Sequence, residues 1–543
     1  MSGTSPKPSL RLLAIGVASG LLLAGCSSEA PSAREAADVL IRGGTVYDGG
    51  SGEAVAADVV IAGDRIAYVG ADAERRYAAE RVIDAAGKVV APGFIDPHTH
   101  PGTYLRSDDP AERRNLPWLM QGATTVMVGV DGRSSLEQAE DGAELEARGI
   151  GTNLASYVGF GSVRHAVLGD DARAPDEAEL ARMRALVAKN MCEGAFGLST
   201  GLFYAPQSFA STEEVVAVAR EAAARGGLYD SHQRDESSYS IGLLESTREA
   251  IRIGREAGMP VHFGHIKALG VDVHGQAQAV IDLIEAAQAE GLRVTADQYP
   301  WLASGTRLEA ALLPRWSVDG GREALLRRLD DPATREKIRG EMRENLRRRG
   351  GADSLLLTSS GQDWTGKTVA EVAAGWNLEP IDAALRIIET GGPAGRPGSA
   401  LASFNMDEAD VKLFMRQPWV MTSSDGSDGH PRQYATFPEK YAKYVKREGV
   451  LSLAEFVHRS TGFTADTLGI ELRGYLRPGY YADVVVFDPQ GFAPKADYVN
   501  PRVLSEGVEQ LFVNGVAAVR DGEPTDARAG RVLSHEPPPG SCP

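Results

Sequence analysis

Cysteine is scarce in this chain, with 3 residues among 543, at positions 26, 192 and 542. Cys26 belongs to a processing signal described below, which leaves Cys192 and Cys542. These two can pair in principle, but two widely separated cysteines make no disulfide framework, and we expect Cys192 to be a small buried residue. Basic residues are also in deficit, since 57 Lys and Arg face 74 Asp and Glu, for a net charge of −17. This balance argues against nucleic acid as a partner.

Long apolar runs are missing after residue 26, so nothing there is typical of a membrane span. Before it, Arg11 precedes an apolar segment over 12–23, which is too short to span a bilayer and typical of a secretory signal. The segment ends in Leu23-Ala24-Gly25-Cys26, which resembles the bacterial lipoprotein signal, with cleavage before Cys26 and lipid on its sulfur. A plain cleaved signal is the alternative. We therefore expect a signal peptide over 1–25, a polar tether over 26–37, and an exported protein that a lipid anchors to the cell envelope.

The length of the chain suits a barrel plus an accessory domain. Alternating apolar residues punctuated by Gly and Asp, over 38–90 and again over 466–543, predict a small antiparallel sheet at each end, paired into one β-sandwich. Between them, strands alternate with helical stretches such as 212–225 and 246–257, as in βα units. Eight strand candidates end at His100, Val130, near Phe160, Thr200, His232, Lys267, Tyr299 and Asp425.

Eight such repeats predict an α/β fold with a (β/α)₈ TIM-like barrel over 91–465, whose catalytic groups lie at the carboxyl-terminal ends of the strands. Residues 301–418 are too many for one crossover. They contain a charged helical run over 321–349 and an extra apolar strand over 355–357. We expect them to form an insertion over the site.

The strand ends carry residues that bind metals. His98 and His100 follow the apolar run Val89-Val90-Ala91, and residues two apart in a strand project to the same side. Alone, this pair would be two surface histidines on a turn. Other strand ends add His232, His265 and Asp425, so four imidazoles and a carboxylate converge as a divalent metal requires. This set resembles the metal signature of the amidohydrolase superfamily.

Further segments, from about Val39 onward, resemble the N-acyl-D-amino-acid deacylase (D-aminoacylase) family. The resemblance implies a zinc-dependent enzyme with one or two divalent ions. Its substrates would be N-acyl-D-amino acids or D-residue peptides, cleaved to a carboxylate and a free D-amino acid. The preference for D over L rests on the resemblance alone. The segments are 193–204 (EGAFGLSTGLFY), 232–236 (HQRDE), 265–267 (HIK), 297–300 (DQYP), 313–316 (LPRW), 430–432 (HPR) and 435–438 (ATFP).

One departure from the family concerns the metal. The family carries a bridging Cys in a Gly-Asn-Cys-Gly turn, where this chain reads Gly129-Val130-Asp131-Gly132. Strand four ends in Ser199-Thr200 and offers neither the Lys nor the Glu that bridges metals in other amidohydrolases. Asp131 is the evident replacement, and because a carboxylate is harder than a thiolate, other divalent metals become possible beside zinc. Asp-Gly also favours turns for backbone reasons, so a turn without a ligand stays open.

The resemblance also implies roles for the site residues. His232 and His265, with Asp131, would hold the metal that polarises the scissile carbonyl, and His98, His100 and Asp425 would complete a second position. Geometry makes Asp425 the general base. A substrate with a free α-carboxylate needs a cationic partner, and the planar fork of Arg432 suits it, although a single Arg is more often a surface charge. The further substrate-binding candidates are Lys267, Tyr299 and Tyr204.

Two other functions remain as alternatives. The first is a dipeptidase or cyclic-amide hydrolase with the same metal chemistry, against which the missing strand-four Lys counts. The second is a non-catalytic envelope-binding lipoprotein whose metal site has been lost. The intact set of four histidines and Asp425 argues against such decay.

Overall fold

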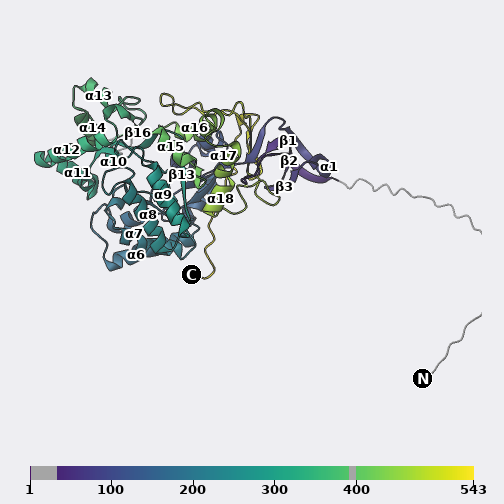
Figure 1. Cartoon of the computed structure of the whole chain (residues 1–543), viewed down its shortest axis with the longest axis horizontal. Helices are drawn as coiled ribbons and strands as arrows, with labels where there is room; N and C mark the ends of the chain where they lie inside the picture. Colours follow the sequence, from purple (N-terminus) through teal and green to yellow (C-terminus); the bar gives the residue numbers. More distant parts are fainter. Residues whose placement is uncertain (2–33, 391–398) are drawn as a thin grey trace, which may run out of the picture.

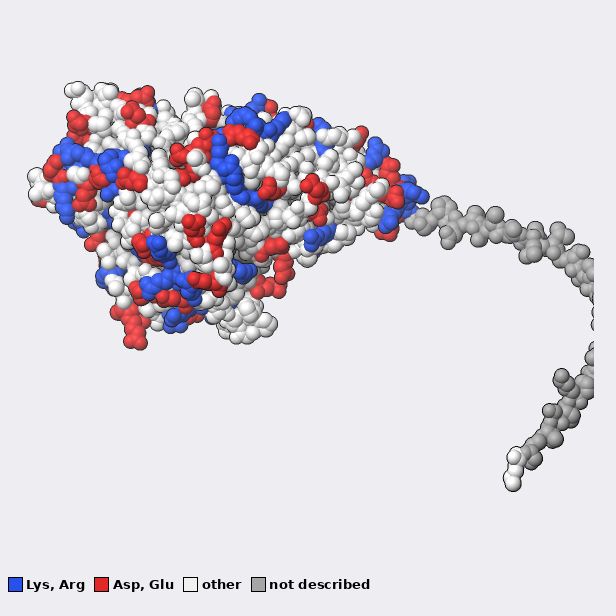
Figure 2. All heavy atoms as spheres, viewed as in Figure 1, with Lys and Arg blue, Asp and Glu red and all other residues white. Residues whose placement is uncertain are grey.

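The computed structural model describes residues 1, 34–390 and 399–543 (Figure 1). Cys26 and the signal predicted around it lie outside the described residues. Within the described part, no helix has both the length and the apolarity to cross a bilayer. Figure 1 shows a sheet carrying β1 to β3, with α1 beside it, at one end of the long axis and helices α11 to α14 at the other, with α15 to α18 between them. Acidic and basic side chains are interspersed over the face seen in Figure 2.

Parallel strands form the central barrel. One sheet has the order β17-β13-β12-β11-β10-β9 and a second the order β6-β7-β8. A bridge between Thr99 and Gly426 joins the first strand to the last, and β8 and β9 are two pieces of one strand. The expected (β/α)₈ fold is therefore confirmed. The strands are β6 (Phe94–Asp96), β7 (Ala123–Val128), β8 (Asn153–Ser156), β9 (Val158–Gly159), β10 (Gly197–Gly201), β11 (Leu228–His232), β12 (Val261–Phe263), β13 (Val294–Gln298) and β17 (Val420–Thr422).

Amphipathic helices cover the outside of the barrel. In α7, Ser211 caps the first turn by accepting from the Glu214 amide, and Val215, Val218 and Ala222 recur at helical spacing on the buried face. These residues share a core cluster with Val261 and other outward-facing strand residues. The covering helices are α4 (Gln138–Arg148), α5 (Phe160–Leu168), α6 (Glu177–Cys192), α7 (Thr212–Ala223), α8 (Leu243–Ala257), α9 (Ala277–Ala289), α15 (Glu408–Met415) and α17 (Leu453–Ser460). The other helices outside the insertion are α1 (Ala73–Arg76), α2 (Gly102–Leu105), α3 (Leu116–Leu119), α16 (Arg432–Glu439) and α18 (Gly462–Leu468).

Strands from both ends of the chain share one nine-stranded sheet, because β5 pairs with β18 antiparallel. β1 begins at Glu35, so residues 35–37, which were expected to belong to a polar tether, are part of the sheet. The sheet is mixed rather than antiparallel throughout: α1 returns the chain after β3, so that β4 runs parallel to β1, and β5 does the same. The strands are β1 (Glu35–Val46), β2 (Val55–Ala62), β3 (Arg65–Gly70), β4 (Tyr77–Asp84), β5 (Val89–Pro92), β18 (Val484–Phe487), β19 (Val508–Val513), β20 (Val516–Arg520) and β21 (Glu523–Pro524).

The long segment between β13 and β17 folds around a core of its own, which includes Leu308, Leu355 and Leu385. It ends before α15, which packs on α9 as a barrel helix, so the insertion is shorter than residues 301–418. The charged run is two helices rather than one, because Asp331 caps a new helix and Pro332 at its start has no amide hydrogen to donate. The elements are β14 (Ala303–Arg307), β15 (Leu355–Leu357), β16 (Ala400–Phe404), α10 (Leu308–Leu312), α11 (Gly321–Asp330), α12 (Pro332–Arg348), α13 (Val369–Trp376) and α14 (Pro380–Thr390).

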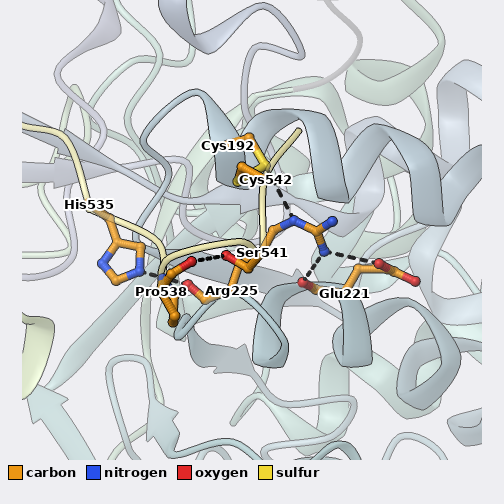
Figure 3. The surroundings of a disulfide bond; sticks show 7 residues. All are labelled: Cys192, Glu221, Arg225, His535, Pro538, Ser541 and Cys542. Atoms are coloured by element: carbon orange, nitrogen blue, oxygen red, sulfur yellow. Dashed lines mark hydrogen bonds and ion pairs between the residues drawn. A yellow bond between two sulfur atoms is a disulfide. The ribbon is translucent and has the colours of Figure 1, made fainter.

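The segment after β21 returns along the barrel and is tied to it covalently. Val532 bridges to Leu154 of β8, and the His535 amide donates to the Gly194 carbonyl at 2.9 Å. Cys542 then forms a disulfide with Cys192 at the end of α6 (Figure 3). The pairing that the sequence left open therefore exists, and the expectation that Cys192 is buried is wrong, because the residue is partly exposed. The pairing was hidden because 350 residues separate the two cysteines in sequence.

Removing this cross-link will destabilise the protein. We expect Cys192→Ser to lower the free energy of unfolding by ~2–5 kcal/mol, because the bond restricts the unfolded chain. Thermal unfolding with and without reductant measures this: reductant should lower the Tm of the parent protein to that of the variant and leave the variant unchanged. Equal Tm values for the oxidised parent and the variant would contradict the prediction.

Candidate metal centre

The residues predicted to bind metal meet at the carboxyl-terminal mouth of the barrel. The Oδ1 atom of Asp425 lies 3.2 Å from His100 Nε2 and 3.9 Å from His98 Nε2. Except for His100, which is partly exposed, these side chains are buried. The barrel supplies each of them from a strand or the loop after it: His98 and His100 after β6, Asp131 after β7, His232 at the end of β11, His265 after β12 and Asp425 after β17.

Asp131 lies at the centre of the four imidazoles. Its Oδ1 atom is 3.0 Å from His232 Nδ1 and 3.4 Å from both His265 Nε2 and His98 Nε2, while Oδ2 is 3.5 Å from His100 Nε2. Asp131 thus belongs to two groups of potential ligands, one with His98 and His100 and one with His232 and His265. Asp131 would therefore be shared by two ions if both groups held one.

The backbone is strained at the same place. Asp131, His265 and Asp425 have φ of 55°, 38° and 46°, in the left-handed region that residues other than glycine rarely adopt. Each such residue costs ~1–3 kcal/mol and persists only where its surroundings hold it there. Gly264 shows how closely the site is packed, because a Cβ there would lie 2.9 Å from the His98 ring. The strained backbone directs the side chains of these three residues toward one point.

The donor set fits divalent ions. Both ring nitrogens of His98 are buried without a hydrogen-bond partner, which is unfavourable unless another group binds them. Burial and Lys267 would lower the pKa of His265, yet Asp425, Glu236 and Asp131 raise it to about 10. His265 therefore holds a proton that a divalent cation would displace. Imidazole nitrogen and carboxylate oxygen are ligands for zinc and for other first-row metals.

Carboxylates that the sequence patterns did not single out lie behind the histidines and support them. Glu236 Oε1 lies 3.3 Å from His265 Nδ1 and accepts from Lys267 Nζ at 2.7 Å. Asp297 accepts from the His265 amide at 2.8 Å and lies 3.9 Å from His98 Nδ1. Such partners fix the orientation of a ligand ring. The signals were present in the sequence, since Glu236 follows His232 by four residues and Asp297 precedes Tyr299 by two.

His262 also belongs to this support. Its Nε2 atom lies 2.8 Å from Asp297 Oδ2, and its Nδ1 atom lies 2.9 Å from Thr295 Oγ1. Burial would raise the pKa of Asp297, but the His262 hydrogen bond and the charge of His98 hold it at about 2. His262 therefore orients Asp297 from inside the barrel.

The predicted substrate-binding residues line one cavity of about 850 Å³, a size ordinary for small-molecule sites. Arg432 forms an ion pair with Asp425 Oδ2 at 2.7 Å. The Arg432 and Lys267 cations lie 4.9 and 5.7 Å from the centre of the Tyr299 ring, whose buried hydroxyl has no hydrogen-bond partner. Tyr204 is elsewhere in the cavity, with its ring 4.8 Å from that of His232. Lys267, Tyr299 and Arg432 thus form one cationic cluster beside Asp425.

A (β/α)₈ barrel with histidines and carboxylates at its mouth defines a metal-dependent hydrolase of the amidohydrolase class. The amidohydrolase family matches residues 81–519, and the chain belongs to that family. A curated relative, the D-aminoacylase of Alcaligenes xylosoxydans xylosoxydans, is 33% identical over 525 residues, which cover 92% of this chain and 97% of the relative. The predicted resemblance to N-acyl-D-amino-acid deacylases is confirmed.

Two solved structures match over the same extent. The N-acyl-D-glutamate deacylase of Bordetella bronchiseptica, complexed with zinc and a phosphonate mimic of the tetrahedral intermediate, has a TM-score of 0.78 at 30% identity, over 92% of this chain and 100% of that one. A D-aminoacylase with a binuclear metal centre, in which one metal activates and the second attenuates, has a TM-score of 0.76 at 32% identity with equal coverage.

Replacing Asp131 will weaken metal binding. We expect Asp131→Ala to lower zinc affinity at least about tenfold, as losses around metal sites commonly do. Asp131→Cys should restore it and favour zinc over manganese, because a thiolate is softer. Metal content after dialysis against graded zinc buffers measures both. Asp170→Ala, which changes a carboxylate elsewhere on the cavity wall, is the control. Unchanged zinc affinity in Asp131→Ala would return Asp131 to the role of a turn residue.

Proposed function

We propose that this protein is a metal-dependent hydrolase that cleaves the amide bond of N-acyl-D-amino acids, or of peptides with a D-residue, to a carboxylate and a free D-amino acid. One observation carries the proposal: two potential metal sites share Asp131 and open into a cavity that also holds a cationic cluster for a carboxylate. The similarity to N-acyl-D-amino-acid deacylases supports the substrate class and zinc as the metal.

His232, His265 and Asp131 would hold one ion, and His98, His100 and Asp425, with Asp131 between, a second. Bound there, a divalent ion polarises an amide carbonyl and acidifies water. Asp425 is placed to accept a proton and return it to the leaving amine. Burial would raise the pKa of Asp425, but Arg432 and His265 hold it well below its usual range, so the carboxylate is ionised at neutral pH.

The cationic cluster binds and orients the substrate. Arg432, Lys267 and the free hydroxyl of Tyr299 together offer donors for both oxygens of an α-carboxylate. With the carboxylate held there and the amide held at the metals, the Cα substituents of the two enantiomers point in different directions. The support for D rather than L comes from the relatives.

The ring-opening alternative has less support. At strand four, the Ser199 hydroxyl donates to Asp230 Oδ2 at 2.9 Å and accepts from the Gly132 amide at 3.0 Å, so it is engaged within the barrel wall. No lysine stands there to bridge two metals. A dipeptidase or cyclic-amide hydrolase therefore remains only as an outcome of the test below.

The activity test compares enantiomers and metals. The mature protein is stripped with a chelator, reloaded with zinc, manganese or cobalt, and given paired N-acetyl-D- and N-acetyl-L-amino acids, with release of free amine as the readout. We expect metal-dependent hydrolysis selective for the D series. Asp425→Asn should lose about 10²–10⁴-fold in kcat because the general base is gone, while most of the metal stays bound.

Two results would contradict this. A folded, metal-loaded protein silent on every N-acyl-D-amino acid would favour the dipeptidase or cyclic-amide reaction. A folded protein that binds no metal would favour the non-catalytic lipoprotein. Arg327→Met, on an exposed side chain of α11, controls for surface substitution and should keep full activity.

We also propose that the protein is exported and anchored to the cell envelope by lipid on Cys26. The support comes from the signal-like residues 11–26 and, independently, from the Cys192–Cys542 disulfide. Structural disulfides persist in oxidising compartments and are rare in the cytosol. The membrane would thus be a partner through acyl chains rather than through a spanning helix.

Cys26→Ala tests the anchor. Expressed in bacteria fed labelled palmitate, the parent chain should carry label and sediment with membranes, whereas Cys26→Ala should do neither, because the acyl chains are attached at that sulfur. Cys192→Ser is the matched control and should remain labelled. A parent chain without label would overturn the proposal.

A further inference from the structure

Two arginines on the cavity wall are not used by the proposed reaction. Arg315 and Arg349 both come from the insertion, after α10 and α12. Arg315 Nη1 donates to the carbonyls of Ala310 and Leu313, and Arg349 Nε donates to the Tyr239 hydroxyl at 2.5 Å. Within 34–390 and 399–543, neither guanidinium is paired with a carboxylate, and Arg315 Nη2 and Arg349 Nη1 are buried without a hydrogen-bond partner.

An unpaired buried cation is unfavourable, and this pair has lost much of its hydration. Arg349 is 1% exposed. Burial, with Arg349 nearby, lowers the pKa of Arg315 to about 10, and the side chain still carries its charge at neutral pH. Two guanidiniums with unused donors, on the wall of a cavity, match the planar oxygens of a carboxylate. The wall therefore has a second place for an anion.

Aromatic rings link this second place to the metal centre. The Arg315 Cζ atom lies 4.0 Å from the centre of the Phe203 ring, and that ring lies 5.9 Å from the ring of His232. Tyr239, the partner of Arg349, packs edge-on against Phe203 at 5.4 Å. The metal ligand His232 is thus separated from the arginines by one layer of side chains.

Phe203, whose ring Arg315 contacts, follows a different barrel strand from the residues of the cationic cluster. Phe203 follows β10, whereas Tyr299 follows β13 and Arg432 follows β17. In the sheet, β11 and β12 separate β10 from β13, and these two strands carry His232 and His265. A substrate whose α-carboxylate is bound at Arg432, and whose amide lies at the metals, therefore directs its acyl group toward Arg315 and Arg349.

We propose that Arg315 and Arg349 bind a second carboxylate at the far end of the acyl group, so that the preferred substrates are D-amino acids acylated by a dicarboxylic acid, such as succinyl or glutaryl. This inference rests on the proposed hydrolase function for its orientation. It names the acyl side of the substrate, which the metal centre and the α-carboxylate cluster leave open.

The test compares two substrates that differ in the acyl group alone, N-succinyl-D-leucine and N-acetyl-D-leucine, on the zinc-loaded enzyme. We expect the succinyl substrate to have a kcat/KM at least about tenfold higher, as one charge-assisted pair provides. Arg315→Met and Arg349→Met should each remove the preference and keep the rate on N-acetyl-D-leucine. Arg315→Lys should keep part of the preference for the succinyl substrate. Arg327→Met, the exposed control, should keep all of that preference.

Equal kcat/KM values of the parent enzyme on the two substrates would overturn the inference. Met variants that lower the rate on both substrates equally would also overturn it, because such a loss indicates a structural role for the arginines. A preference for N-acetyl-D-glutamate that the Met variants abolish would place the anion on the amino-acid side chain instead. A binding measurement separates this inference from the proposed function. Even without turnover, calorimetry should show that the zinc-loaded parent protein binds glutarate more tightly than butyrate. Arg315→Met should bind the two ligands equally. Equal binding of the two ligands by the parent protein would again overturn the inference.

Discussion

The Asp131 carboxylate is the contact on which the rest of the site depends. It approaches all four metal-site histidines, which come from three strands of the barrel. Without this carboxylate, four largely buried imidazole rings would face one another. Once protonated, their positive charges would repel one another. With it, strand ends distant in sequence acquire a common anionic centre. The left-handed backbone at Asp131, His265 and Asp425 is tolerated because the surrounding barrel over-determines those positions.

Much of the barrel and its ligands could be predicted because they are local patterns. Apolar strands ending in His or Asp signal both the strand and the direction of its last side chains, as at His98 and His100. What could not be predicted depends on contacts between distant segments. Cys192 pairs with Cys542, and Arg315 and Arg349 reach the cavity from the insertion. Pro332 signals a break between two helices, but we expected one charged helical run over 321–349.

The barrel interior also serves the site. In this fold the interior is commonly filled by branched apolar side chains. Here a polar layer lies beneath the metal ligands. Burial raises the pKa of Asp96 to about 7, against hydrogen bonds from Ser424 and Trp118, and burial also raises the pKa of Asp230. Such groups cost stability unless they are satisfied. The network orients the histidine rings. The barrel interior is therefore less stable than an apolar one would be, a loss of stability that is common at active sites.

The bond between α6 and the segment after β21 makes the oxidised fold sensitive to the loss of that segment. A chain cut between β21 and Cys542 retains a free thiol at Cys192 once the bond is reduced or never forms. Such a proteolytic product thus differs chemically from the oxidised protein, even if its barrel is whole. Quality control that recognises exposed thiols would have a means of telling the two apart.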